Sequence, residues 1–262
     1  MARLSAQPML SPADEDAATV AFIDFDFTTM PETSVIQMLA QRPADAPFAY
    51  VVTPNVDHAV RLQRSRSDLW PVYRAAGLTL CDSRILALLA RQAGLVLPVI
   101  PGSDLTRLLF EKVIHPADPV TIIGANPEQV QMLVQRYGLN RVYHYNPPMG
   151  FIRDPVEIAT AVQFVVGAKA RYNFFAVGSP QQEILAYRVQ QAGGGRGIGF
   201  CIGASLDFLT GTQKRAPMLM RLVAMEWFYR LVSDPARMWR RYLCDGPGIL
   251  QVMRDWKRGF RL

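Results

Sequence analysis

Four short motifs in this chain of 262 residues place polar residues or glycine directly after an apolar run, where they could hold a ligand. They are residues 53–58 (Thr-Pro-Asn-Val-Asp-His), 81–83 (Cys-Asp-Ser), 124–127 (Gly-Ala-Asn-Pro) and 178–183 (Gly-Ser-Pro-Gln-Gln-Glu). Backbone amides at helix N-termini attract phosphate, and glycine lets a backbone approach it closely. Each turn alone is also typical of an ordinary helix cap. Several of them on one edge of a sheet predict a ligand that carries a diphosphate.

Three side chains near these motifs could take a proton. Asp82 follows an apolar run directly, and its position is equally suited to a general base and to a cap for a helix that starts near Ser83. His58 and Asp104 are alternative bases, although a single histidine on a helix is as often a packed residue. Position alone leaves these alternatives open.

A fifth motif, at residues 22–28, suggests a different chemistry. Its Asp24-x-Asp26-x-Thr28 pattern matches phosphatases of the haloacid dehalogenase type, in which the first carboxylate attacks phosphorus. It also matches the paired aspartates that hold a metal-bound nucleotide sugar in many glycosyltransferases. However, residues 122–126 contain no carboxylate for magnesium, and the alternation alone predicts that Asp24 and Asp26 lie on one solvent face of a strand.

The motifs are spaced by short β-rich runs that alternate with helical stretches. The runs cover residues 48–53, 77–81, 97–100, 120–123, 141–145, 172–177 and 197–202. This alternation predicts an α/β fold with a doubly wound, mainly parallel, Rossmann-like sheet. An eighth run, 21–27, precedes a turn at Met30-Pro31 and predicts an outer strand or an N-terminal β-hairpin. In such sheets ligands bind outside the carboxyl ends of the strands.

Composition is typical of a packed core, because half of the residues are hydrophobic and 19% are charged. No apolar run approaches the roughly 18 residues that a membrane span requires, and the N-terminus lacks a signal-peptide pattern. We therefore expect a cytoplasmic protein. The cysteines Cys81, Cys201 and Cys244 are widely spaced, so reduced, packed thiols are predicted. We divide the chain into a disordered N-terminus (1–18), an α/β domain (19–212) and a helical basic appendage (213–262).

The appendage contains the chain's excess of positive charge. Residues 214–262 hold eleven Lys and Arg against four acids, together with three of the four tryptophans. Arg237, Arg240 and Arg241 share one helical face, and the apolar stretch 218–232 must pack on the core, on a second subunit of a homo-oligomer or on lipid. Mixed cations and aromatics favour peripheral binding to an anionic membrane surface. Together with the strand-end turns, they leave open a non-catalytic nucleotide-binding protein that docks on membranes through this segment. Nucleic acid is not predicted, because neither zinc-finger spacing nor an RNP pattern accompanies the charge.

The order of the motifs along the chain resembles the WecG/TagA/CpsF glycosyltransferase family, bacterial enzymes that extend lipid-linked saccharides for surface polymers. No single motif is specific, but the series is. It runs through residues 53–55, Asp82, 102–105 (Gly-Ser-Asp-Leu), 124–127, 178–183, 203–208 (Gly-Ala-Ser-Leu-Asp-Phe), 214–217 (Lys-Arg-Ala-Pro), 226–231 (Glu-Trp-Phe-Tyr-Arg-Leu) and 239–243 (Trp-Arg-Arg-Tyr-Leu).

The resemblance implies an inverting transfer of a hexose from a nucleoside diphosphate sugar, with uridine as the expected nucleoside. The implied acceptor is a hydroxyl of a polyprenyl diphosphate-linked saccharide, which places the enzyme on the inner face of the cytoplasmic membrane. Within the family the chain looks most like the branch that adds the second sugar in xanthan-type exopolysaccharide assembly. That branch implies UDP-glucose and a β-1,4 linkage.

The resemblance also implies roles for single residues. Asp82 would be the general base, and Thr53 and Asn55 would orient sugar or acceptor. The other donor-binding or acceptor-binding positions are His58, Asp104, Gly124, Gln182 and Asp207. Arg215 and the later arginines would offset charge on the departing diphosphate. The chain departs from the family pattern at three places. Val99-Ile100-Pro101 stands where many members carry an arginine. Ser83 stands where glycine is common, and Gln181 stands where lysine is common. These changes bear on the donor and on diphosphate binding; no cofactor or metal site is predicted, and a need for divalent metal stays open.

Overall fold

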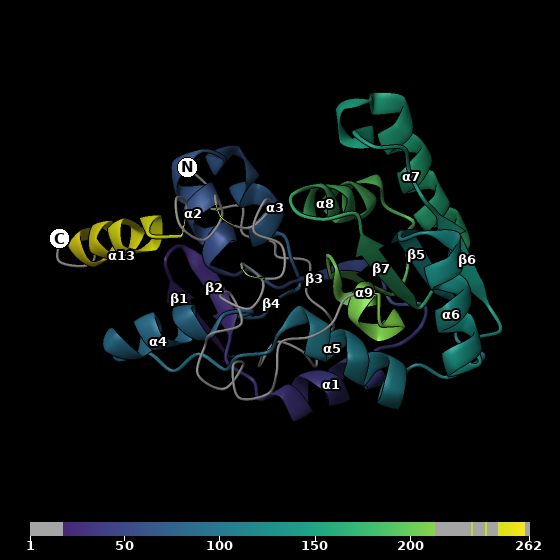
Figure 1. Cartoon of the computed structure of the whole chain (residues 1–262), viewed down its shortest axis with the longest axis horizontal. Coiled ribbons are helices and arrows are strands. Elements are labelled where there is room, and N and C mark those ends of the chain that lie inside the picture. Colours follow the sequence, from purple (N-terminus) through teal and green to yellow (C-terminus); the bar gives the residue numbers. More distant parts are fainter. Residues whose placement is uncertain (1–17, 213–231, 233–238, 240–245, 260–262) are drawn as a thin grey trace.

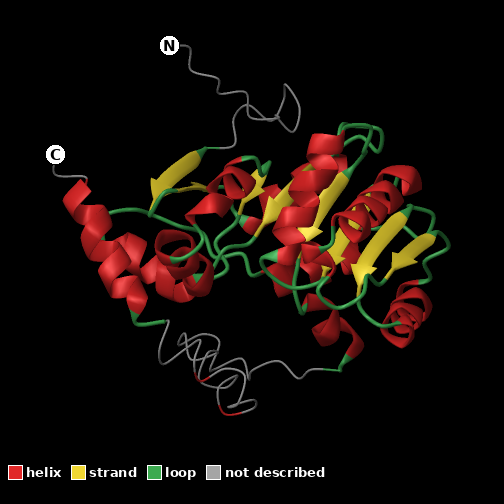
Figure 2. Cartoon of the chain, turned by 90° about the horizontal axis from the view of Figure 1, so that it is seen from above, coloured by secondary structure: helices red, strands yellow, loops and turns green. Residues whose placement is uncertain are grey.

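The computed structural model describes residues 18–212, 232, 239 and 246–259, and Figures 1 and 2 show their arrangement from two directions. The predicted disorder of residues 1–18 falls almost entirely outside this part. The four arginines proposed for the diphosphate and the membrane, Arg215, Arg237, Arg240 and Arg241, also lie outside the described residues. The division of the chain at residue 212 stays a prediction.

The centre of the molecule is a sheet of six parallel strands in the order β4-β3-β8-β7-β5-β6. The strands are β3 (Ala49–Val52), β4 (Leu78–Thr79), β5 (Val120–Gly124), β6 (Val142–Tyr145), β7 (Tyr172–Ala176) and β8 (Ile198–Cys201). This sheet confirms the predicted mainly parallel α/β fold. Six of the seven runs expected from the sequence form its strands, each within two residues of the predicted bounds.

Helices cover both faces of the sheet because successive side chains of a buried strand point to opposite sides. In β3, Tyr50 and Val52 belong to one hydrophobic cluster while Ala49 and Val51 belong to the other. Figure 1 shows α7 and α8 on one side of the sheet and α1 and α5 on the other. The first cluster includes residues of α2 (Val56–Arg64), α3 (Trp70–Arg74), α4 (Arg84–Gln92), α7 (Pro155–Ala168), α8 (Gln181–Ala192) and α13 (Gly248–Gly259). The second includes residues of α1 (Glu32–Gln41), α5 (Gly102–Leu108), α6 (Pro127–Tyr137) and α9 (Ser205–Thr210).

Three short helical turns complete the described chain. These are η2 (Ser67–Leu69), η3 (Leu109–Val113) and η4 (Phe151–Arg153). The turn η3 extends α5 directly, and both pack on the second cluster through Leu105, Leu109 and Phe110.

The N-terminal run at 21–27 forms a β-hairpin, which was one of its two predicted structures; the other was an outer strand. Strands β1 (Thr19–Phe22) and β2 (Phe25–Thr28) pair antiparallel. The turn between them is Ile23-Asp24, with φ of 47° and 64°, so the prediction that Asp24 lies on a strand is wrong. The hairpin packs on the C-terminal helix, where the Phe22 and Trp256 rings lie 5.2 Å apart edge to face.

The predicted strand at 97–100 is wrong. Val99 makes a single parallel bridge with Cys81, and the Ile100 backbone N–H donates to the Cys81 carbonyl at 2.9 Å. Pro98 and Pro101 flank this contact and have no N–H to extend a ladder. The segment therefore extends the edge beside Asp82 without becoming a strand.

Candidate active site

The polar motifs meet at one edge because all six strands of the central sheet run parallel. Strand β4 pairs with β3 on one side, and β8, β7, β5 and β6 follow on the other side of β3. The strand order thus reverses between β3 and β8. At such a reversal the loops diverge and leave a crevice outside the carboxyl ends, where α/β proteins bind their ligands. The geometry directs attention to the residues that follow β3, β4 and β8.

Thr53 follows β3 and lies at this reversal. Its hydroxyl is 3.5 Å from the Cys201 carbonyl at the end of β8. Gly102, the first residue of α5, packs so closely that a Cβ there would lie 2.9 Å from Thr53 Oγ1. A glycine at this position therefore lets α5 approach the end of β3.

Asp82 lies beside the Thr53-Pro54-Asn55 turn. Its backbone N–H donates to the Pro54 carbonyl at 3.1 Å, which joins the ends of β3 and β4. The N-cap of α4 is Ser83, whose hydroxyl accepts from the Leu86 N–H at 3.2 Å. The alternative role of Asp82 as the cap of this helix is therefore wrong. Asp82 is partly exposed, and its backbone is held by the turn.

Asn55 caps α2 and is held by His58. Asn55 Oδ1 accepts from the Asp57 N–H at 3.0 Å, and the Asn55 N–H donates to His58 Nδ1 at 3.3 Å in a reciprocal capping box. His58 is 7% exposed, and its other ring nitrogen faces Glu183 Oε1 at 3.6 Å. The ring is therefore engaged on both sides and lies behind the turn.

Gln182 connects the ends of β7 and β8. Its Oε1 accepts from the Gly203 N–H at 2.7 Å, and its Nε2 donates to Glu183 Oε1 at 2.8 Å. Both side-chain polar atoms of this buried residue thus have protein partners. In this structure Gln182 holds two loops together, and its expected part in donor binding stays a prediction.

Glu183 is a buried carboxylate, 1% exposed. Burial is the largest influence and acts to raise its pKa, but the hydrogen bonds and charge of His58, together with Gln182, outweigh it and leave the pKa below the usual range. Burial raises the pKa of Tyr73 and of Cys201, and the charge of Glu183 raises both further. We conclude that the carboxylate is ionised and sets the local electrostatics.

Gly124 ends β5 with φ of 89°, a conformation that glycine adopts without strain. A Cβ at this position would lie 2.8 Å from the Ala176 carbonyl at the end of β7. His144 on β6 approaches the Gly124 carbonyl with Nε2 at 3.0 Å. The glycine therefore has a packing reason to be there, in addition to any approach of a ligand.

Asp207 lies in the first turn of α9 and pairs with α6. Its Oδ1 accepts from Gln129 Nε2 at 2.6 Å. Gln129 also shares a capping box with Asn126, in the turn after β5. Asp207 is thus tied to the end of β5, at some remove in strand order from Asp82. Asp104 belongs to the first turn of α5, with Oδ1 4.0 Å from Arg107 Nε.

A cation that the sequence analysis did not assign reaches the end of β7. Arg61 on α2 donates from Nη2 to the Ser179 hydroxyl at 2.6 Å and lies 3.4 Å from Asp57. Glu183 was named only as the end of the 178–183 motif and was given no role, because a polar residue in the first turn of a helix is common. The Asn55-x-x-His58 spacing of a capping box was the one available signal for this group; the partners on α8 have none in the local sequence.

Among the described residues, no group of three or more His, Cys, Asp and Glu side chains could hold a metal ion. Asp24 and Asp26 are exposed, and Asp24 accepts from Gln63 Nε2 at 2.6 Å. They belong to the hairpin, outside the parallel sheet and its carboxyl edge. No helix within the described part of the chain is long and apolar enough to cross a membrane.

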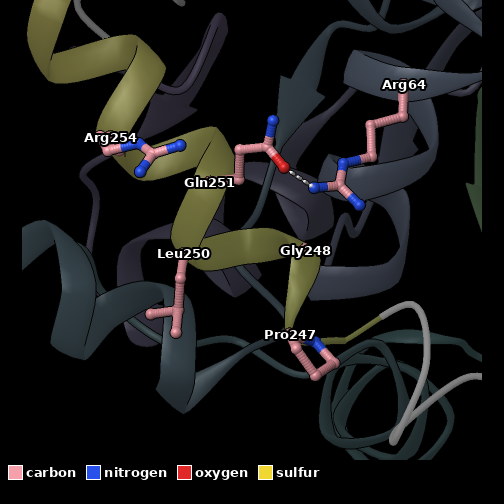
Figure 3. Close-up of a pocket in the computed structure, with 6 residues that line it drawn as sticks. All are labelled: Arg64, Pro247, Gly248, Leu250, Gln251 and Arg254. Atoms are coloured by element: carbon pink, nitrogen blue, oxygen red, sulfur yellow. Dashed lines mark hydrogen bonds between the residues drawn. The ribbon is translucent and has the colours of Figure 1, made fainter.

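A pocket of about 550 Å³ lies between α2 and α13, as Figure 3 shows. Arg64 donates to Gln251, and Arg254 lines the same pocket. Arg64 is the last residue of α2, whereas Asn55 caps its first turn. At a rise of 1.5 Å per residue, about 12 Å of helix separates this pocket from the strand ends.

The chain matches the family model described as "Glycosyl transferase WecG/TagA/CpsF family" over residues 19–261. It belongs to the WecG/TagA/CpsF glycosyltransferase family. This confirms the resemblance drawn from the ordered motifs and makes the protein a glycosyltransferase. Neither the match nor the fold favours the phosphatase or the non-catalytic nucleotide-binding alternative.

Two curated relatives share the name N-acetylglucosaminyldiphosphoundecaprenol N-acetyl-beta-D-mannosaminyltransferase. The protein of Bacillus spizizenii is 26% identical over 212 residues, which cover 79% of each chain. That of Bacillus subtilis is 25% identical over 231 residues, which cover 86% of this chain and 87% of the relative. The glycosyltransferase thus aligns with about four fifths or more of the length of each relative.

Proposed function

We propose that this glycosyltransferase moves a hexose from a uridine diphosphate sugar to a polyprenyl diphosphate-linked saccharide, with inversion at the anomeric carbon. The acceptor class is supported by the names of the two relatives, which act on a diphosphoundecaprenol-linked sugar. Two donors come into question. The resemblance of the sequence to the xanthan-type branch suggests glucose, and the relatives' names suggest N-acetylmannosamine.

The position of Asp82 is the observation that carries the proposal. It lies at the edge where the strand order reverses, and its backbone is bonded to the Thr53-Pro54-Asn55 turn. Because Ser83 caps the following helix, the carboxylate of Asp82 is not needed for that purpose. A carboxylate on a partly exposed residue can take a proton from a sugar hydroxyl during attack.

In the proposed step the acceptor oxygen attacks the anomeric carbon from the face opposite the diphosphate. A new carbon–oxygen bond forms as the bond to the diphosphate oxygen breaks, and the leaving group departs with that electron pair. The proton of the attacking hydroxyl passes to the Asp82 carboxylate. Thr53 and Asn55 would orient the sugars, and the Arg61 guanidinium at the end of β7 would offset part of the diphosphate charge.

The test compares wild type with Asp82→Asn in transfer of radiolabelled sugar. The donors are a panel of uridine diphosphate sugars that includes glucose and N-acetylmannosamine, and the acceptors are polyprenyl diphosphate-linked glucose and N-acetylglucosamine. We expect one donor to be used and Asp82→Asn to lower kcat by about 100-fold or more, which is the usual contribution of a general base. Asp45→Asn, at an exposed loop position, is the matched control. Full activity in Asp82→Asn would exclude the assigned base.

The same proposal includes peripheral binding to an anionic membrane. The helix that the structure describes within the basic appendage is α13, whose Ile249, Val252 and Met253 are buried in the first cluster. Arg254, Lys257, Arg258 and Leu250 of this helix are exposed, and they line a pocket with Leu89 and Gln92 of α4. Exposed cations beside an exposed apolar side chain suit an anionic surface with an apolar layer beneath.

A further inference from the structure

The loops after β3, β7 and β8 are joined by a continuous row of buried polar side chains. Asn55 contacts His58, His58 faces Glu183, and Gln182 bonds both to Glu183 and to the Gly203 N–H. His58, Gln182 and Glu183 are respectively 7%, 4% and 1% exposed. Apart from Asn55, which is partly exposed, the members of this row are buried where they cross the reversal in strand order.

Glu183 is at the centre of this row. One carboxylate oxygen, Oε1, meets both His58 Nε2 and Gln182 Nε2. The other, Oε2, is buried and has no hydrogen-bond partner among the residues that the structure describes. A buried carboxylate is costly to desolvate, and a buried ion pair is weak evidence for stability. Its arrangement therefore calls for a reason other than core packing.

The chemistry of the pair gives such a reason. A carboxylate can only accept hydrogen bonds, so Glu183 favours a proton on His58 Nε2, the ring nitrogen that faces it. Nδ1 is then an acceptor, and it accepts from the Asn55 backbone N–H at 3.3 Å. The carboxylate thus fixes the orientation of the imidazole, and the imidazole fixes the turn that contains Asn55.

We propose that Glu183 and His58 act as a positioning pair that holds the Thr53-Pro54-Asn55 turn in register with the Gly203 loop. This inference rests on the proposed function, in which that turn orients the reacting sugars. Neither residue touches substrate in this proposal. Their effect is on the placement of the turn, and misplacement by about an ångström lowers turnover as much as 100-fold.

The test uses Glu183→Gln, His58→Gln and the double variant. Glutamine keeps the size of Glu183 and removes its charge, and glutamine at position 58 can still complete the capping box of α2. The matched control is Glu157→Gln. Glu157 is likewise the third residue of its helix and is hydrogen-bonded, by the Tyr145 hydroxyl at 3.0 Å, but belongs to α7.

Two measurements are made on each protein. Steady-state transfer should show kcat lowered about tenfold in each single variant, with the KM for donor changed less than threefold. The double variant should lose no more than the worse single variant, whereas independent residues would multiply their losses. Hydrogen exchange should be faster at the Asn55 and Gly203 amides in Glu183→Gln, and unchanged at both in Glu157→Gln.

The outcomes separate this inference from the proposed function. Multiplied losses in the double variant, or unchanged kcat and unchanged exchange in Glu183→Gln, would overturn the positioning pair while the transferase stands. If wild type transfers no sugar from any donor, the proposed function fails, and exchange alone decides the inference. Faster exchange at both amides would then support the pair, and unchanged exchange would refute it.

Discussion

Replacing Gly102 by alanine should lower turnover while the fold is retained, because the added methyl group meets Thr53. A Cβ at position 102 would lie 2.9 Å from Thr53 Oγ1 and 3.6 Å from Thr53 Cβ. Normal contacts lie near 3.5 Å, so the hydroxyl must move by about half an ångström or rotate about χ1. Either change breaks its 3.5 Å approach to the Cys201 carbonyl.

The expected effects on activity and stability differ in size. A shift of about half an ångström in a sugar-orienting hydroxyl should lower kcat about tenfold, since a full ångström can cost about 100-fold. Alanine gains up to about 1 kcal/mol over glycine in a helix, and an off-rotamer side chain costs about 0.5–1.5 kcal/mol. The free energy of unfolding should therefore change by less than about 1 kcal/mol.

The assay combines steady-state sugar transfer with urea unfolding of wild type, Gly102→Ala and Gly167→Ala. Gly167 is also helical, in α7, but a Cβ there meets nothing within 4 Å. This control should gain about 1 kcal/mol in stability and keep its kcat. In a Gly102→Ala/Thr53→Ala double variant the clash disappears, so the loss should not exceed that of Thr53→Ala alone.

Two results would refute this reasoning. A kcat for Gly102→Ala within twofold of wild type would mean that the position of the Thr53 hydroxyl is unimportant for turnover. A loss of stability above about 3 kcal/mol would mean that the backbone of α5 shifts in place of the side chain.

Two further predictions concern pH and lipid. Burial acts to raise the pKa of Glu183, but its hydrogen bonds outweigh burial and lower the pKa below 4.5. Ionised Glu183 therefore stabilises the fold above pH 4.5. This contribution is lost as the pH falls through the lower pKa of the folded state. Thermal unfolding should therefore show wild type losing stability relative to Glu183→Gln below about pH 4.5, and identical pH profiles would contradict it. Neutralising the three exposed cations of α13 should weaken flotation with anionic liposomes by about 100-fold, at about 1 kcal/mol for each cation. A control neutralises exposed cations elsewhere, Lys112, Arg141 and Arg153, and an equal loss in both would remove the case for this helix.

The sequence predicted most of the sheet because its strands are buried on both faces. Such strands are short apolar runs bounded by glycine, proline and polar residues, and the pattern is local. The failure at 97–100 has a local cause too, since Pro98 and Pro101 remove the donors that a ladder requires. The Ile23-Asp24 turn was hidden because a β-branched residue such as Ile23 rarely adopts a positive φ, and no glycine or proline marks the turn.

The candidate site divides in the same way. Sequence alone placed Thr53, Asp82 and Gly124 after strands, and parallel strands necessarily bring such residues to one edge. It left two roles open for Asp82, helix cap and general base. A side-chain hydrogen bond to the first turn decides which residue caps a helix, and in α4 the residue after Asp82 makes it. The Ser83 hydroxyl makes that bond.

Sequence by itself thus determined the class of the fold, the edge that carries the polar residues and the family. The tertiary structure decided which of those residues share a neighbourhood. That decision depends on strand order, since β3 and β8 are neighbours in the sheet although they are far apart in the chain. Glu183 meets His58 only because of this order, and burial then makes their attraction strong. No local pattern encodes such a pair, because its energy comes from the surroundings that the whole fold provides.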